Sequence, residues 1–435
     1  MPAHELSEQQ VVSLSEASGE DRWLRELRIK AWKAFERMPM PDPRSEAWRH
    51  TDIRDLDLGA FSLANGGPAA QTLEALPRDL AGAVADPEES QAVLIEWNDQ
   101  PLHRPSQHAP DCEGIVFADL RTALRCPILR ERFMTQCLPP DAGKFVALHG
   151  AFTRAGALVH LPPGIKVAAP LRAVHGLAGE GAAIFPHTLI VAEAGSELTF
   201  IDEYYGGDGA GLCAAAVEVF LGDGARLRYA SVQGLGQGAW HFCRVRVLLG
   251  RESDFQGVVV ALGGKTARSE VETVLSAEGA SSEMFGLTLA SGYQHLDNRT
   301  LQHHAAKHTR SDLLYKAAVK GSARSIYGGT IRVDASAQRS DAYQASRNLI
   351  LDEKAKAHSI PSLEILADDV RCTHGATVGR LDDEQLFYLE SRGIGRKQAE
   401  RLLVRAFLED IIARLKDEGL RARIEGAVEA KLVST

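Results

Sequence analysis

Residues 187–204 read HTLIVAEAGSELTFIDEY, and this stretch decides the fold because two short apolar runs flank a turn rich in Ala, Gly and Ser. Runs of Val, Ile, Leu and Phe separated by such turns indicate β-strands. The same pattern of two apolar runs around a turn recurs in AAVEVFLGDGARLRYASV (215–232), CRVRVLLGRESDFQGVVV (243–260) and VETVLSAEGASSEMFGLTL (271–289). Residues 146–381 are therefore predicted to be built mainly from strands.

The turns between these runs recur along the chain. EAGSEL, GDGARL and AEGASS begin at residues 193, 222 and 277, spacings of 29 and 55 residues, and KGSARS and DASAQR follow them. Such recurrence is typical of stacked β-coils, in which no coil can bury its apolar face without its neighbours. We therefore expect a mainly β fold with a parallel β-helix. A β-sandwich also suits short strands with regular turns and stays open as the alternative.

Helical patterns flank the strand region on both sides. Residues 21–38 and 119–138 place apolar residues at helical spacing, and residues 395–415 do the same near the C-terminus. The apolar face of the last pattern is expected to hold Ala399, Leu402, Leu403, Ala406, Phe407, Ile411 and Leu415. The chain is thus predicted to contain a mainly helical domain (1–145), a parallel β-helix (146–381) and a C-terminal helical domain (382–435). Periodicity does not decide whether this tail packs on its own β domain or docks on a partner.

Bulk properties exclude several classes of protein. The 435 residues carry a formal net charge of −9, which argues against nucleic acid as the main partner, although a local basic patch stays compatible with it. The six cysteines form no CxxC pair, which disfavours a zinc ribbon or a self-contained ferredoxin-like site. The sequence shows no secretory signal and no apolar run of transmembrane length. We expect a cytoplasmic protein without a membrane partner, in a compartment where thiols stay reduced.

Residues 368–382, DDVRCTHGATVGRLD, place Cys372 and His374 two positions apart. If this stretch is extended, both side chains point to the same face. Two donors cannot hold a metal alone, because tetrahedral sites need three or four ligands. From spacing alone, a buried cysteine and a hydrogen-bonded histidine is the favoured interpretation. The adjacent Asp368 and Asp369 are expected to accept backbone hydrogen bonds in a turn.

A second histidine group lies in LQHHAAKHTRSDLLYK, residues 301–316. On a helix His304 and His308 would share a face, but the glutamate of HExxH is missing and strands surround the segment. We expect His303, His304 and His308 to be structural, and their roles stay open. No phosphate-binding loop is present, since VALGGKTARSE (260–270) has the wrong spacing, so the chain is not expected to hydrolyse ATP.

The stretch from residue 298 to 394 resembles the SufB/SufD family of iron-sulfur cluster assembly proteins, and within it the SufD branch. The resemblance is carried by SDLLYK, IYGGTIRV, AQRSDAYQASRNLIL and PSLEILADDVRCTHGATVGRLDDEQLFYLESRGI, and by PDPRSEAWRHTDI near the N-terminus. It implies a right-handed parallel β-helix between helical domains. It also implies a non-enzymatic subunit that meets a SufB-like subunit through the β-helix and a SufC-type ABC ATPase through the C-terminal helices.

The family's CxHGATVG motif falls on residues 372–379 of this chain. The resemblance implies that His374 is a metal ligand or proton relay for a transient iron-sulfur cluster, which a cysteine of the SufB-like partner would share. Cys372 is the weaker cofactor-binding candidate. SufB-like chains carry an essential cysteine in TQCDS where this chain has AQRSD, with Arg339 in its place. The Cys372 and His374 pair would then be half of a site, completed across a subunit boundary.

Other interpretations stay open at this point. The chain could be a purely structural scaffold in which His374 binds nothing. A polysaccharide-active β-helix enzyme is the other rival, but no convincing carboxylate cluster supports it. No motif supports FAD binding, and the sequence does not say whether the isolated chain forms a homodimer.

Overall fold

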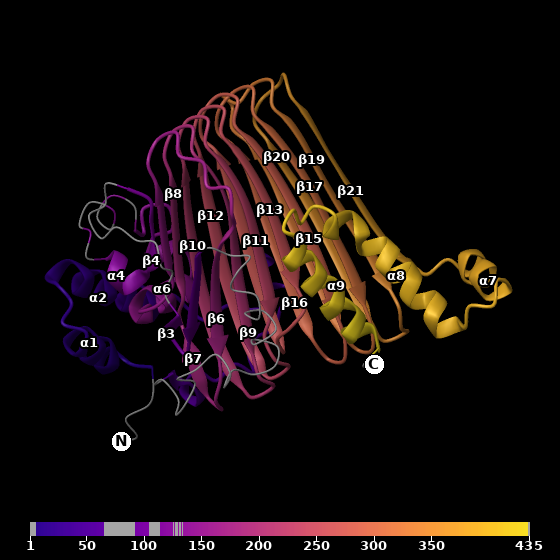
Figure 1. The fold of residues 1–435 in the computed structure, drawn as a ribbon, viewed down its shortest axis with the longest axis horizontal. Helices are drawn as coiled ribbons and strands as arrows, with labels where there is room; N and C mark the ends of the chain where they lie inside the picture. Colours follow the sequence, from indigo (N-terminus) through magenta and orange to yellow (C-terminus); the bar gives the residue numbers. More distant parts are fainter. Residues whose placement is uncertain are drawn as a thin grey trace.

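The computed structural model describes residues 6–64, 92–103, 114–124 and 134–433, together with residues 126, 129 and 132. Most of this part of the chain forms a parallel β-helix of about 8 coils, seen in Figure 1 as long strands stacked side by side. The prediction of a mainly β fold built on a parallel β-helix, with helices at both ends, is confirmed.

Two sheets form the walls of this solenoid, and from β8 onward successive strands alternate between them. Sheet A contains β1 (Ser62–Leu63), β4 (Val116–Asp119), β5 (Ala157–Leu161), β7 (Ala182–Ile184), β8 (His187–Ala192), β10 (Gly211–Leu221), β12 (Ala239–Leu249), β14 (Thr266–Leu275), β16 (His295–His304), β18 (Arg324–Val333) and β20 (Lys356–Ile365). Sheet B contains β2 (Ala92–Trp97), β3 (Gln100–His103), β6 (Leu171–Leu177), β9 (Glu197–Gly206), β11 (Arg226–Gly234), β13 (Asp254–Ala261), β15 (Ser281–Ala290), β17 (Arg310–Val319), β19 (Asp341–Ile350) and β21 (Arg371–Arg380).

The coils stack in register, so equivalent residues form continuous rows through the solenoid. The pairing of β9 with β11, β13 and β15 aligns Phe200, Tyr229, Gly257 and Met284 in one interior row, which continues to Leu313 in β17. The rings of Phe200 and Tyr229 are nearly parallel, at 3°. Side chains alternate between the two faces of each strand, so every second residue enters the apolar interior. This alternation is the pattern that the sequence shows.

Glycines in the left-handed region explain the recurring turns. Gly195, Gly224, Gly279 and Gly321 have φ between +66° and +75°. The first three are the third residue of EAGSEL, GDGARL and AEGASS, and Gly321 is the second residue of KGSARS. A residue with a Cβ is strained in this conformation, so glycine is the natural choice. In DASAQR the left-handed residue is Arg339, at φ +60°.

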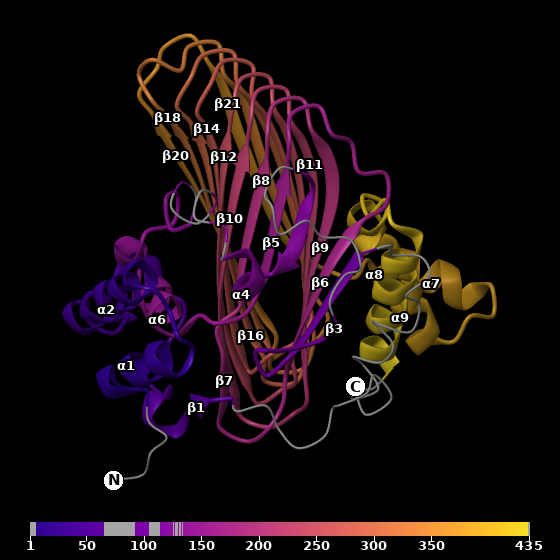
Figure 2. The ribbon, with the colours of Figure 1, turned by 60° about the vertical axis from the view of Figure 1, so that its left-hand side comes forward.

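Helices cover the two outer faces of the solenoid. They are α1 (Glu8–Ala17), α2 (Arg22–Arg37), α4 (Leu120–Ala123), α6 (Lys144–Phe152), α7 (Asp383–Ser391), α8 (Arg396–Ile412) and α9 (Glu418–Val433), with 3-10 turns at Glu46–Trp48, Leu58–Ala60 and Pro140–Ala142. Figure 2 shows α1, α2 and α6 on one flank and α8 and α9 on the opposite flank. On the sheet A side, the ring of Phe145 stacks on that of Phe242 with centroids 3.6 Å apart.

The structure shows where the C-terminal helices pack, which periodicity did not decide. Helices α8 and α9 pack on the outer face of sheet B, where Val404, Leu408 and Ile411 join one apolar cluster with strand residues such as Val258 and Leu287. The tail therefore packs on its own solenoid. Helix α7 instead projects away from it in Figure 1.

The predicted apolar face of α8 was partly wrong. Ala399, Ile411 and Leu415 are buried as expected, but Leu402 is 41% exposed, and Val404 and Leu408 are buried instead. Apolar residues lie on more than one side of α8. The side that carries Val404 and Leu408 contacts sheet B, whereas periodicity predicted the side that carries Leu402.

The N-terminal part of the chain contributes strands as well as helices. Within the 119–138 helix candidate, residues 125, 127, 128, 130, 131 and 133 lie outside the described residues, and α4 (Leu120–Ala123) covers its start. Strands β2, β3 and β4 extend the two sheets, with β3 and β4 pairing antiparallel to their neighbours at the N-terminal end of the solenoid. Cys126 is disulfide-bonded, so the expectation that the thiols stay reduced is wrong at this position. Among the described residues, no helix combines the length and apolar character needed to span a membrane.

A buried ion cluster ties the first coils together. His175 of β6 lies between Glu96 of β2, 2.9 Å from its carboxylate, and Asp202 of β9, 3.0 Å away. Asp202 also accepts hydrogen bonds from the hydroxyls of Tyr204 and Tyr229. Burial lowers the pKa of His175, but bonds and charges from the two carboxylates outweigh it and raise the pKa to about 10. His175 is therefore protonated at neutral pH and holds three strands through charge-assisted hydrogen bonds.

We expect the substitution His175→Gln to lower the free energy of unfolding at pH 7 by about 3–5 kcal/mol, because it leaves two buried carboxylates without their cation. Denaturant unfolding followed by far-UV circular dichroism measures the change. Lys166→Gln is the matched control, since Lys166 pairs with Glu197 on the surface and its loss should cost under about 1 kcal/mol. An equal effect of both substitutions would show that the buried cluster has no special role. Because the pKa of His175 is raised, its stabilisation should be full below about pH 6.5 and disappear as the pH rises through about 10.

Candidate functional site

The last coil of the solenoid carries the two residues that the sequence singled out. Cys372 and His374 lie on β21, the outermost strand of sheet B, where they pair in register with Ala342 and Gln344 of β19. Those two partners are 1% exposed and belong to interior rows. Cys372 and His374 therefore share the inward side of the last coil, as the extended interpretation predicted.

No further coil covers these residues. In the preceding coil the interior positions of β19 are buried, whereas most residues of β21 are exposed. Cys372 is half-buried and His374 is exposed. Within the described part of the chain, His374 has no hydrogen-bond partner. The favoured interpretation of a buried cysteine beside a hydrogen-bonded histidine is therefore wrong, since both donors face an open end.

The environment of Cys372 keeps its thiol protonated. Partial burial raises the pKa of this thiol, and the nearby carboxylate of Asp341 raises it further, while a backbone hydrogen bond from Ala342 opposes both. A thiol in this state binds a metal only when the metal itself displaces the proton. In the described residues no group of three or more His, Cys, Asp or Glu side chains could hold a metal ion. The pair is thus an incomplete donor set.

Arg339 lies at the turn that leads into β19. Its backbone N–H donates to the carbonyl of Asp369 at 2.6 Å, and its guanidinium lies 3.4 Å from the Asp369 carboxylate. The main-chain carbonyl of Asp369 accepts this bond and its carboxylate pairs with Arg339, so the predicted backbone hydrogen bond to the Asp369 carboxylate is not seen among the described residues. An exposed ion pair therefore stands where the resemblance places a cysteine in SufB-like chains.

The histidines of residues 301–316 do not form a site. His303 and His304 are consecutive on β16 and point to opposite faces, so the helical spacing of His304 and His308 never arises. His304 is buried in the interior between the hydroxyls of Thr309 and Ser311, at 2.7 and 2.8 Å. His303 lies on the outer face, 2.9 Å from Asp334. Their hydrogen bonds support the structural roles expected for them.

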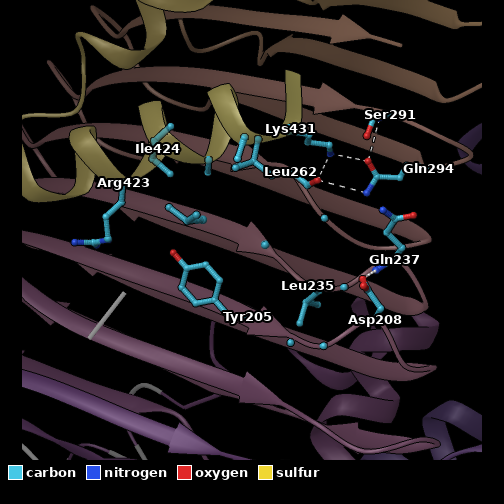
Figure 3. Close-up of a pocket in the computed structure, with 18 of the residues that line it drawn as sticks. Tyr205, Asp208, Leu235, Gln237, Leu262, Ser291, Gln294, Arg423, Ile424 and Lys431 are labelled. Atoms are coloured by element: carbon cyan, nitrogen blue, oxygen red, sulfur yellow. Dashed lines mark hydrogen bonds between the residues drawn. The ribbon is translucent and has the colours of Figure 1, made fainter. Parts of the chain in front are cut away.

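A cavity of about 680 Å³ between α9 and the ends of the sheet B strands is a second candidate. Figure 3 shows Tyr205 and Leu235 on its strand side and Ile424 on its helix side. At one end, the ammonium group of Lys431 donates to the carbonyl of Leu262, to that of Leu289 at 2.5 Å and to Oε1 of Gln294 at 2.6 Å. Sequence reasoning missed this cavity because its wall comes from turns and a helix far apart in the chain.

Comparisons with known proteins identify the family. The model of the SUF system FeS cluster assembly SufBD core domain matches residues 175–407, and the model of the SufBD protein N-terminal region matches residues 5–173. The chain belongs to the SufBD family. It is similar to the iron-sulfur cluster assembly protein SufD of Bacillus subtilis, 29% identical over 435 residues, which covers 98% of each chain.

Other relatives include proteins named for the SufBD family and a SufB protein. A SufBD family protein of Mycobacterium leprae is 34% identical over 280 residues, covering 62% of this chain and 70% of that protein. The assembly protein SufB of Bacillus subtilis is 26% identical over 428 residues, covering 95% and 90%. The chain is thus a SufBD family iron-sulfur cluster assembly protein and a SufD homologue, and the resemblance stated from its motifs is confirmed. The core match includes the open end that carries Cys372 and His374.

Among the free thiols that the structure describes, Cys372 should react first in the native protein. Cys137, Cys213 and Cys243 are buried, whereas Cys372 is partly accessible. We expect N-ethylmaleimide to modify Cys372 slowly at pH 7 and faster as the pH rises, because the thiolate is the nucleophile and its pKa is raised. Peptide mass spectrometry after timed quenching locates the label, and Cys372→Ser is the control. Faster labelling of Cys213 or Cys243 would contradict the burial described above.

Lys431 should make stability depend on pH above neutrality. Burial lowers the pKa of this ammonium group to about 7. Between about pH 7 and 10 the unfolded chain binds this proton and the folded chain does not, so the free energy of unfolding should rise with pH. Comparing wild type with Lys431→Met by urea unfolding at pH 7, 8 and 9 isolates this contribution. The difference between the two proteins should change across the series, and a constant difference would show that Lys431 titrates normally.

Proposed function

We propose that this chain is the non-ATPase scaffold subunit of an iron-sulfur cluster assembly complex, and that His374 supplies one donor to a nascent cluster shared with a SufB-like subunit. The observation that carries the proposal is the open last coil, which presents an incomplete donor set to solvent. Two donors on one edge strand, with no group of three or more side chains among the described residues that could hold a metal ion, suit a site that a second chain completes.

The open end is suited to association with another β-helix. Strands β20 and β21 terminate their sheets, so each offers backbone groups on its outer edge that no strand in the described part of the chain uses. Exposed apolar side chains lie at the same end, among them Ile360, Ile365 and Val378. A partner strand would satisfy the backbone groups, cover the apolar side chains and enclose His374 and Cys372 in a drier environment, where electrostatic interactions strengthen.

The C-terminal helices offer a separate surface for an ATPase subunit. Helix α7 projects from the solenoid, and its Phe387 and Tyr388 are 73% and 57% exposed. Exposed aromatic residues on a projecting helix are typical of binding surfaces, because they bury large areas on contact. An ATPase that moves α7 could transmit force through α8 to sheet B. Such a movement would shift this chain against its partner and change the distance between donors on the two chains.

The rival functions have less support. Glu270 and Glu272 on the outer face of sheet A are engaged, since both pair with Arg244 and Glu272 also pairs with Arg246. Acid–base cleavage of a polysaccharide needs a carboxyl pair that is free to exchange protons. A scaffold in which His374 binds nothing is the alternative that the next experiment separates.

The test is anaerobic co-purification of this chain with its SufB-like and ATPase partners, followed by reconstitution with iron and sulfide and visible absorption spectroscopy. We expect the His374→Ala complex to assemble but to gain at least about tenfold less cluster absorption than wild type, as for loss of a first-sphere metal contact. His303→Ala is the matched control, because His303 faces outward two coils away. Equal absorption in all three complexes would make this subunit a structural scaffold without a ligand role.

A further inference from the structure

The cavity between α9 and sheet B has no part in the proposed function. One wall comes from the ends of β9, β11 and β13 and the turns after them, and the other wall comes from α9 (Figure 3). Its volume of about 680 Å³ lies within the roughly 300–1,000 Å³ that is typical of small-molecule sites. The cavity lies several coils before β21, so it is separate from Cys372 and His374.

Both walls of the cavity present apolar side chains. They are Val232, Leu235 and Leu262 on the sheet side, and Ile424, Ala427 and Ala430 on the helix side. Apolar walls that face each other across a space of this size suit a ligand with an apolar body, because such a ligand leaves water when it binds.

Two glycines in opposite walls leave space that packing within the chain does not require. Gly207 follows β9, and Gly426 lies inside α9. Neither has the positive φ that demands glycine, and a Cβ at either would meet no neighbouring atom of the described residues within 4 Å. At Gly236 and Gly263, by contrast, a Cβ would lie 2.0 Å from a backbone oxygen of the preceding coil. Glycine destabilises a helix interior relative to alanine, and its usual benefit is the close approach of another group.

One cation at the cavity has unused hydrogen-bond donors. The guanidinium of Arg423 carries five N–H groups, and its one hydrogen bond within the described part of the chain runs from Nη2 to Glu203, at 3.0 Å. Its Nε is buried without an acceptor there. Glu203 also accepts a hydrogen bond from Arg172, at 2.6 Å, so one carboxylate serves two guanidiniums. A buried donor without an acceptor is costly, and a bound anion would remove this cost.

The second cation, Lys431, lies about 12 Å along α9 from Arg423, since the two residues are eight positions apart. Its ammonium group donates to the carbonyls of Leu262 and Leu289 and to Oε1 of Gln294, which engages its three N–H groups. An acidic group at Lys431 would have to displace one of these oxygens. Arg423 is therefore the better anchor for an anion.

We propose that this cavity binds a small organic acid, with its apolar body between the two walls and its carboxylate on the guanidinium of Arg423. Charge-assisted hydrogen bonds from a guanidinium to a carboxylate are strong and directional, so they fix the orientation of the ligand. Asp208 at the exposed rim of the sheet wall repels the acidic group and favours the same orientation. The bound acid would contact α9 and sheet B together and so hold the helix on the solenoid. The site would bind its ligand whether or not the chain has the partners of the proposed function.

The test uses the isolated full-length chain and 1-anilinonaphthalene-8-sulfonate, an amphipathic anion whose fluorescence rises in apolar sites. We expect saturable binding of this dye and its displacement by octanoate. The neutral analogue 1-octanol has the same chain length, and at least about tenfold more of it should be needed, because it cannot form charge-assisted hydrogen bonds. Arg423→Gln should remove most of this difference between octanoate and 1-octanol.

Variants that fill the cavity give a second test. Gly426→Leu and Gly207→Leu occupy it from opposite walls, and each should weaken octanoate binding by at least about tenfold. Gly379→Leu is the matched control, because Gly379 also has open space around it but lies on β21. At this distance it should change binding by less than about twofold.

Thermal unfolding supplies a measurement that needs no dye. Octanoate should raise the unfolding temperature of wild type and of Gly379→Leu, but not that of the two variants with a filled cavity. Unfolding without octanoate shows whether each variant is folded. Three results would overturn the proposal: no saturable dye binding by wild type, equal displacement by octanoate and 1-octanol, or unchanged octanoate binding in both filled variants.

Discussion

The stacking of one coil on the next is the constraint on which the rest of this structure depends. Each coil is a single layer of two strands, too thin to bury its own apolar side chains, so it is stable only between neighbours that continue its rows and its backbone hydrogen bonds. At the N-terminal end the two sheets finish in the antiparallel strands β3 and β4, while the N-terminal helices pack on the outer face of sheet A. At the C-terminal end the helices pack against the side of sheet B, and the last coil stays open. The edge strands of the last coil therefore keep backbone groups that are not paired within the described residues.

The interior changes character toward that open end. The row that begins with Phe200 and Tyr229 continues through Met284 and Leu313 and ends in Gln344 and His374. The amide of Gln344 reaches across the solenoid to the carbonyl of Gly329, so even the polar part of the row holds the two sheets together. The functional candidates are therefore the last members of structural rows. They gain their accessibility from the absence of a following coil and not from any change in backbone geometry.

Much of this fold was predictable because it repeats. Glycine must recur where each turn needs a left-handed residue, and apolar residues must recur where each coil fills the interior, so Gly195, Gly224 and Gly279 leave a signal at regular spacing. Single contacts leave no such signal. The buried stripe of α8 depends on which side meets sheet B, and the hydrogen bonds of Lys431 involve backbone carbonyls far away in sequence. For Cys372 and His374, the shared face followed from spacing, but their exposure follows only from their place at the end of the stack.

The single-sided bonding of β21 has a thermodynamic consequence. A strand that is hydrogen-bonded along one edge opens at a lower free energy than strands held on both sides, so the donors lie on one of the least protected elements of the solenoid. A chain that pairs with this end orders β21 in advance, so a cluster that binds there afterwards costs less conformational entropy of the strand. Linkage requires the converse as well: a cluster held by donors on both chains tightens their association by the same factor by which association tightens its own binding. Under the proposed function, loading and release of a cluster would then also change the affinity between the subunits.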